Sequence, residues 1–178
     1  ISWVVHSHAS NLNATELRDK LIHLKNTTEK ALVMSGGAKL LELGFFIRRM
    51  DNFLMDLMVE QDNLCEMLEI LVETHLSGLE KKCSTLGDIV DVIRFGDDLG
   101  MTSGAFMDLE TFRKIFKPRY RILCDYVKKH SNMKIFLHSC GSIKQYIPDL
   151  IDVGFDILNP VQTNCYDMEP VALKKKYG

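Results

Sequence analysis

Short apolar runs alternate with segments of helical periodicity along the chain. The runs predict strands within residues 30–37, 88–96, 134–137 and 156–158, and residues 1–5 are compatible with one more short strand. Between the runs, apolar residues recur every three or four positions. They predict helices over residues 16–25, 40–46, 51–61, 64–87, 108–116, 119–130, 142–153 and 169–177, with Pro118 at a break where it can begin the next helix. This alternation indicates βα units around a parallel sheet.

Polar residues and glycines follow the carboxyl end of each predicted strand: "SGG" at 35–37, "GDD" at 96–98, "HSCG" at 138–141 and "NPVQ" at 159–162. In a (β/α)8 TIM barrel these ends share one face, and that face carries the active site. A doubly wound open sheet also binds ligands at strand ends, but at its switch point. Because four successive loops carry unusual polar residues, the α/β fold that we favour is the barrel.

Four strands amount to about half of such a barrel. We therefore expect residues 1–178 to be a single partial domain, the middle portion of a longer chain. Half a barrel leaves two sheet edges without a partner strand. Pairing with a second copy, as a homodimer, is one way to cover these edges.

Composition narrows the class of protein. The chain has 178 residues, 46% of them hydrophobic, which is enough for one domain with a sizeable core. Its 22 basic and 24 acidic residues create no field that would attract nucleic acid or an anionic membrane. No apolar run approaches the roughly 20 residues of a membrane span, so the sequence predicts a soluble protein. Five irregularly spaced cysteines fit the reducing cytoplasm, where neighbouring Cys and His indicate metal binding or catalysis.

His138 and Cys140 are the strongest candidates for chemistry. Residues i and i+2 of an extended strand point the same way, so both side chains can face the barrel mouth. Imidazole and thiolate suit zinc, but a catalytic zinc also needs a third protein ligand and an open position. The alternative, which the spacing alone favours, is a small buried cysteine beside a histidine that bonds a backbone carbonyl. Cys165 is either a third ligand or an incidental loop thiol.

Other polar residues at the strand ends have two interpretations each. Asp97 or Asp98 can bind substrate or act as a general acid or base, or can order the loop as a cap, and the sequence does not separate the two. Asn159 and Gln162 can bind a polar substrate, although Asn before Pro is also an ordinary turn opening. His6 and His8 have no supporting cluster, and we interpret them as surface residues.

Five segments together resemble the uroporphyrinogen decarboxylase superfamily. They are "FGDDLGMTSG", "KPRYRIL", "FLHSCGSI", "IPDLIDVGFDILNPVQT" and "LKKKYG", in this order and spacing. The resemblance covers nearly the whole chain and weakens over about the first dozen residues. It is strongest for the branch that also resembles the corrinoid-dependent methyltransferases, and it implies a (β/α)8 barrel longer than this chain.

What the resemblance implies for function differs between branches. In the methyltransferases, zinc held by a His-x-Cys pair and a later Cys activates a thiol acceptor for attack on a methylated cobalamin. The matching positions are His138 and Cys140, the later ligand would lie beyond Gly178, and a separate corrinoid protein carries the cobalamin. We therefore expect zinc-dependent methyl transfer to a thiol-type small molecule, with Asp97 or Asp98, Asn159 and Gln162 lining the pocket.

Two alternatives remain. Uroporphyrinogen decarboxylases of porphyrin biosynthesis use no metal or cofactor, and hold the tetrapyrrole with an aspartate and with arginines near the N-terminus. That arginine motif does not occur in these 178 residues, and the His-x-Cys-Gly sequence favours the methyltransferase branch. The second alternative is a relative that binds a ligand without catalysis.

Overall fold

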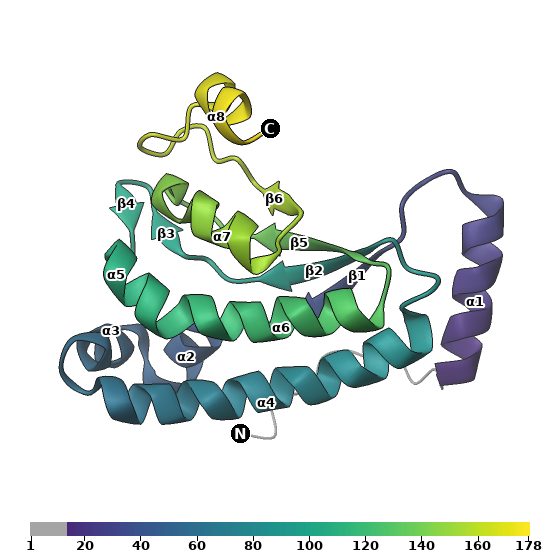
Figure 1. The fold of residues 1–178 in the computed structure, drawn as a ribbon, viewed down its shortest axis with the longest axis horizontal. Helices are drawn as coiled ribbons and strands as arrows, with labels where there is room; N and C mark the ends of the chain where they lie inside the picture. The colour runs from purple at the N-terminus through teal and green to yellow at the C-terminus, as the bar shows by residue number, and fades with distance from the viewer. Residues whose placement is uncertain (1–13) are drawn as a thin grey trace.

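The central element of the structure is a parallel sheet of four strands. The structure is a computed structural model that describes residues 14–178, so the strand expected at residues 1–5, His6 and His8 lie outside the described residues. In chain order the strands are β1 (Val33–Gly37), β2 (Val92–Gly96), β5 (Lys134–His138) and β6 (Ile157–Asn159), and they occur in the same order across the sheet (Figure 1). Each new strand is added beside the previous one, as in a (β/α)8 barrel, without the reversal of a doubly wound sheet.

Helices cover one face of this sheet. The apolar stripe of α4 (Gln61–Leu86) packs beside α6 (Lys117–His130), and both run beneath the strands (Figure 1). The remaining helices are α1 (Ala14–Thr27), α2 (Leu41–Arg48), α3 (Met50–Val59), α7 (Ile147–Val153) and α8 (Pro170–Tyr177). No helix among the described residues is long and apolar enough to cross a bilayer. The four strands predicted within the described residues, and most of the predicted helices, are confirmed.

The two faces of the sheet differ in character. Ile93 and Phe95 of β2 and Ile135 and Leu137 of β5 are fully buried on the helix side. Residues at the alternate positions point to the opposite face, because successive side chains of a strand alternate. Parallel pairing aligns Gly96 with His138, and His138 with Asn159. This second face corresponds to the barrel interior, and its carboxyl-terminal edge is the mouth.

The structure differs from the sequence prediction in its connections. A small antiparallel hairpin, β3 (Gly100–Met101) and β4 (Gly104–Ala105), follows β2 where only a loop was expected. Pro118 lies at the start of α6, as predicted, but no break precedes it, because α5 (Leu109–Thr111), the π-helical segment η2 (Phe112–Phe116) and α6 follow one another without interruption.

Proline has no backbone N–H to donate. Pro118 therefore fits the first turn of α6, and the wider π turn of η2 comes directly before it.

The helix predicted over residues 142–153 is shorter than expected. It is split into a 3-10 turn, η3 (Lys144–Tyr146), and α7.

Candidate metal centre

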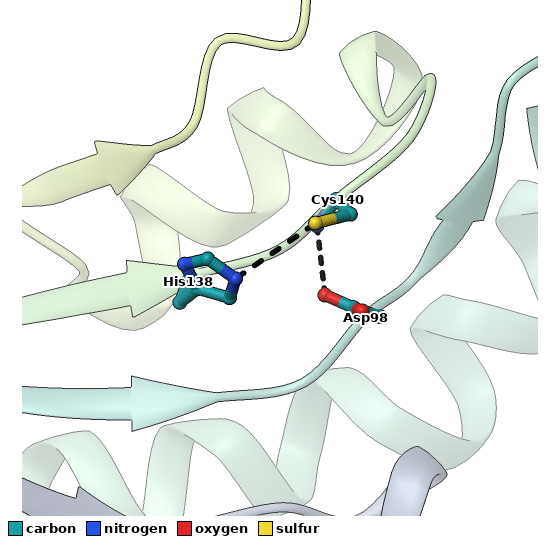
Figure 2. Close-up of side chains that lie close together, drawn as sticks. All are labelled: Asp98, His138 and Cys140. Atoms are coloured by element: carbon teal, nitrogen blue, oxygen red, sulfur yellow. Dashed lines mark hydrogen bonds between the residues drawn. The ribbon is translucent and has the colours of Figure 1, made fainter.

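His138 and Cys140 converge at the carboxyl end of β5. His138 is the last residue of the strand, and its Nε2 atom lies 3.8 Å from the Sγ atom of Cys140 (Figure 2). The other ring nitrogen, Nδ1, lies 2.8 Å from Oδ1 of Asn159, which ends the neighbouring strand β6. An amide oxygen only accepts hydrogen bonds, so Nδ1 carries the proton and Nε2 presents its lone pair toward Cys140.

Asp98 brings a carboxylate to the same point from the loop after β2. Its Oδ1 atom accepts a hydrogen bond of 2.8 Å from the backbone N–H of Cys140, and the thiol donates a second one to the carboxylate (Figure 2). Asp98, His138 and Cys140 can each offer one ligand atom, and these atoms lie within 4.8 Å of one another. All three residues are half-buried, so each remains partly accessible to solvent.

Backbone contacts hold the two loops of this centre together. The N–H of Asp97 donates to the carbonyl of His138 at 3.0 Å, which extends the pairing of β2 with β5 beyond the strands. The N–H of Leu99 donates to Oγ of Ser139 at 3.0 Å, and Ser139 is fully buried. Asp98 therefore lies between two anchored neighbours, which fixes its carboxylate beside Cys140.

The charge of the centre favours a cation. Burial raises the pKa of the Cys140 thiol above its usual range, and the carboxylate of Asp98 raises it further. A bound divalent cation reverses this effect, because it stabilises the thiolate. Within residues 14–178, Asp98 forms no ion pair with a lysine or arginine.

The donor set itself fits zinc. One imidazole, one thiol and one carboxylate are ligands that zinc accepts, and three protein ligands leave a fourth position for a substrate. A histidine ligand usually donates its second ring N–H to an outer partner, as His138 does to Asn159. The alternative to metal binding, a buried cysteine beside a structural histidine, predicted that His138 bonds a backbone carbonyl. Neither ring nitrogen of His138 has such a partner among the described residues.

The structure separates the two adjacent aspartates. Asp97 is fully buried, and its carboxylate accepts hydrogen bonds from the backbone N–H groups of Leu40, Leu41 and Glu42, which lie 2.6, 2.6 and 2.7 Å away at the start of α2. The hydroxyl of Tyr120 donates a fourth bond of 2.6 Å. Burial raises the pKa of Asp97 to about 6, although these four bonds favour the ionised form. The capping interpretation therefore fits Asp97, and Asp98 faces the candidate centre.

The remaining predicted site residues support the centre from outside. Oε1 of Gln162 accepts a bond of 2.8 Å from the N–H of Gly141, which fixes the loop after β5. Asn159 orients His138, as described above. Cys165 is buried and lies outside the group of three donors. Tyr120, which the sequence analysis did not single out, lies within the segment "KPRYRIL".

Comparisons with known proteins agree with this architecture. The family model described as uroporphyrinogen decarboxylase (URO-D) matches residues 41–174. A solved structure described as a methyltransferase from Methanosarcina mazei superimposes with a TM-score of 0.60 at 20% sequence identity. The superposition covers 81% of this chain and 40% of that one, so the chain spans well under half of the methyltransferase. No curated protein sequence matches the chain. These matches confirm the fold class, with four strands of a (β/α)8 barrel.

Proposed function

Because the chain belongs to the uroporphyrinogen decarboxylase family, we propose that it transfers a methyl group from a corrinoid protein to a thiol-type acceptor, with zinc bound by Asp98, His138 and Cys140. The observation that carries this proposal is the convergence of three donor atoms within 4.8 Å at the ends of adjacent strands. The similarity in fold to a methyltransferase supports the same branch of the family.

Each residue of the centre has a defined task in this proposal. His138 and Cys140 hold the metal from the end of β5, and Asp98 completes the protein ligands from the end of β2. When bound, zinc supplies the charge that lowers the pKa of an acceptor thiol and keeps it a nucleophilic thiolate near neutral pH. Asn159 holds the imidazole in the tautomer that can bind the metal. A later cysteine, which the family resemblance implies, would compete with Asp98 for the third position.

The mouth of the half-barrel is where we place the corrinoid protein. The hairpin after β2 exposes Met101, and the loop after β6 exposes Val161 and Tyr166, with exposed fractions of 47%, 37% and 72%. The N–H of Tyr166 donates to the carbonyl of Thr102 at 2.9 Å, so the loop and the hairpin form one rim. Apolar side chains on a rim beside a polar centre are typical of a surface that a partner covers.

Metal analysis of the full chain, purified without chelators, tests the proposal. We expect about one zinc per chain, and loss of most of it in His138→Ala, Cys140→Ser and Asp98→Asn. Cys65→Ser is the matched control, because Cys65 is half-buried on α4 and lies outside the donor group. Absence of zinc from the full chain, or its retention by both His138→Ala and Cys140→Ser, would contradict the proposed centre.

Decarboxylation of uroporphyrinogen is the second candidate, and the description of the matching family model favours it. This reaction would need no metal at His138 and Cys140. It predicts conversion of the porphyrinogen that survives both a chelator and the change His138→Ala. A relative that binds a ligand without catalysis would show neither reaction.

A further inference from the structure

The carboxylate of Glu42 lies at the mouth of the half-barrel and is not one of the three candidate ligands. Glu42 is in the first turn of α2, and its backbone N–H donates to Oδ1 of Asp97 at 2.7 Å. A Cβ atom built on Gly96 would lie 3.6 Å from Oε2 of Glu42. Gly96 pairs in register with His138 on the adjacent strand, and such partners face the same side of the sheet, about 4.8 Å apart. The carboxylate of Glu42 therefore lies over the strand position next to the imidazole.

The two oxygens of this carboxylate have different surroundings. Oε1 lies 2.9 Å from Nζ of Lys39. The stem of Lys39 fills the space that glycine leaves at position 96, because a Cβ atom there would lie 2.8 Å from Cε of Lys39. Oε2 of Glu42 has no hydrogen-bond partner among residues 14–178. The side chain is 24% exposed, so a proton taken up at Oε2 can pass on to solvent water.

The charge of Glu42 acts on the candidate centre. Burial is the main reason that the pKa of the Cys140 thiol is raised, and the carboxylates of Asp98 and Glu42 raise it further. The same physical effect applies to any second thiol that binds beside Cys140, because a negative charge disfavours a thiolate at short range. Glu42 is therefore close enough to interact with an acceptor at this centre.

The other groups around the centre are already occupied. The three candidate ligands use their free donor atoms for the metal in the proposed function. Nδ1 of His138 carries a proton, which Oδ1 of Asn159 accepts. Asp97 is fully buried, and its carboxylate accepts four hydrogen bonds. Glu42, with a free oxygen, is thus the proton acceptor that the described residues provide at the mouth.

We propose that Glu42 accepts the proton that an acceptor thiol loses at the centre of Asp98, His138 and Cys140. This inference rests on the proposed function and adds a residue to it. The S–H bond breaks, its electron pair stays on the sulfur, and the proton forms an O–H bond at Oε2 before it passes to water. A positioned base of this kind typically accelerates proton transfer about 10²- to 10⁴-fold. Glu42 thus supplies the base for the step that makes the sulfur nucleophilic.

Rapid mixing of the cobalt(II)-loaded full chain with ethanethiol tests this role. Ethanethiol has no charged group, and the charge-transfer absorption of cobalt(II) with a thiolate reports the loss of its proton. At saturating ethanethiol and low buffer concentration, Glu42→Gln should slow the rise in absorption about 100-fold. A higher concentration of the buffer base should restore most of this rate and leave the wild type unchanged.

Glu66→Gln is the charge-matched control and should react at the wild-type rate. Glu66 is exposed on α4 and forms no ion pair among the described residues. Glu42→Ala gives a second measurement if Glu42→Gln does not fold, and it should be slowed and restored by the buffer base in the same way.

A purely electrostatic role of Glu42 predicts the opposite result. Loss of its negative charge would favour the thiolate, so Glu42→Gln would react at least as fast as the wild type. Such a rate, a slow rate that the buffer base does not restore, or a wild type without a response to ethanethiol overturns the assignment of Glu42. The metal content of each sample reports on the proposed function independently. Full metal content with an unchanged rate refutes Glu42 alone, whereas a wild type that binds no metal refutes the centre itself.

Discussion

Replacing Asn159 by leucine tests whether the orientation of His138 matters for metal binding. The substitution keeps the approximate size of the side chain and removes the oxygen that lies 2.8 Å from Nδ1 of His138. The backbone carbonyl of Asn159, which accepts a bond of 2.8 Å from Ser139, stays in place. The change is therefore confined to the outer partner of the imidazole.

The expected loss is large in metal affinity and small in stability. Removal of an outer-shell partner of a histidine ligand typically lowers metal affinity about 10- to 100-fold, which corresponds to about 1.4 to 2.7 kcal/mol. Asn159 is exposed, so its neutral hydrogen bond should contribute no more than about 1 kcal/mol to folding. Asn159→Asp should retain or increase the affinity, because a carboxylate accepts the same bond with a full charge.

Competition for zinc against a chromophoric chelator measures this affinity, and urea unfolding of the metal-free protein measures stability. Asn164→Leu, the same substitution in the loop that follows β6, is the control, because the Asn164 side chain forms no hydrogen bond among the described residues. An affinity of Asn159→Leu within twofold of the wild type, while His138→Ala loses zinc, would refute the role that we assign to Asn159. An equal loss in Asn164→Leu would refute it too.

Three further predictions concern the support of the site. Tyr120→Phe should lower the free energy of unfolding by about 1.5 to 3 kcal/mol in urea, since it removes a buried hydrogen bond to a carboxylate; a loss below about 0.5 kcal/mol would contradict this. Burial raises the pKa of Asp97 to about 6, so between about pH 4 and 6 the folded protein keeps a proton that the unfolded chain has lost. The stability of the wild type relative to Asp97→Asn should therefore fall by up to about 3 kcal/mol as the pH rises through this window, and a difference independent of pH would count against the buried titration. Gly141→Ala should lower the free energy of unfolding in urea by at least about 2 kcal/mol. Residue 141 has a φ of +90°, and a Cβ there would lie 2.2 Å from the carbonyl carbon of Gly100. An unfolding midpoint equal to that of the wild type would show that the loop adapts.

The sequence by itself determined the order of the elements and the location of the centre. Apolar runs of strand length bounded by glycines fix β1, β2, β5 and β6 to within a few residues, because burial on the helix side demands such runs. The spacing of His138 and Cys140 at the end of one run placed both on the same face, since side chains of a strand alternate. These predictions depend only on local periodicity.

Only the tertiary structure decided which polar residue does what. Asp97 and Asp98 are adjacent and chemically identical. The backbone N–H groups at the start of α2 bind Asp97, whereas the backbone N–H of Cys140 binds Asp98. Strand register and helix docking bring together residues 40 to 60 positions apart in the chain. They are set by the packing of the whole half-barrel, and therefore lie beyond the reach of a pattern read along the sequence.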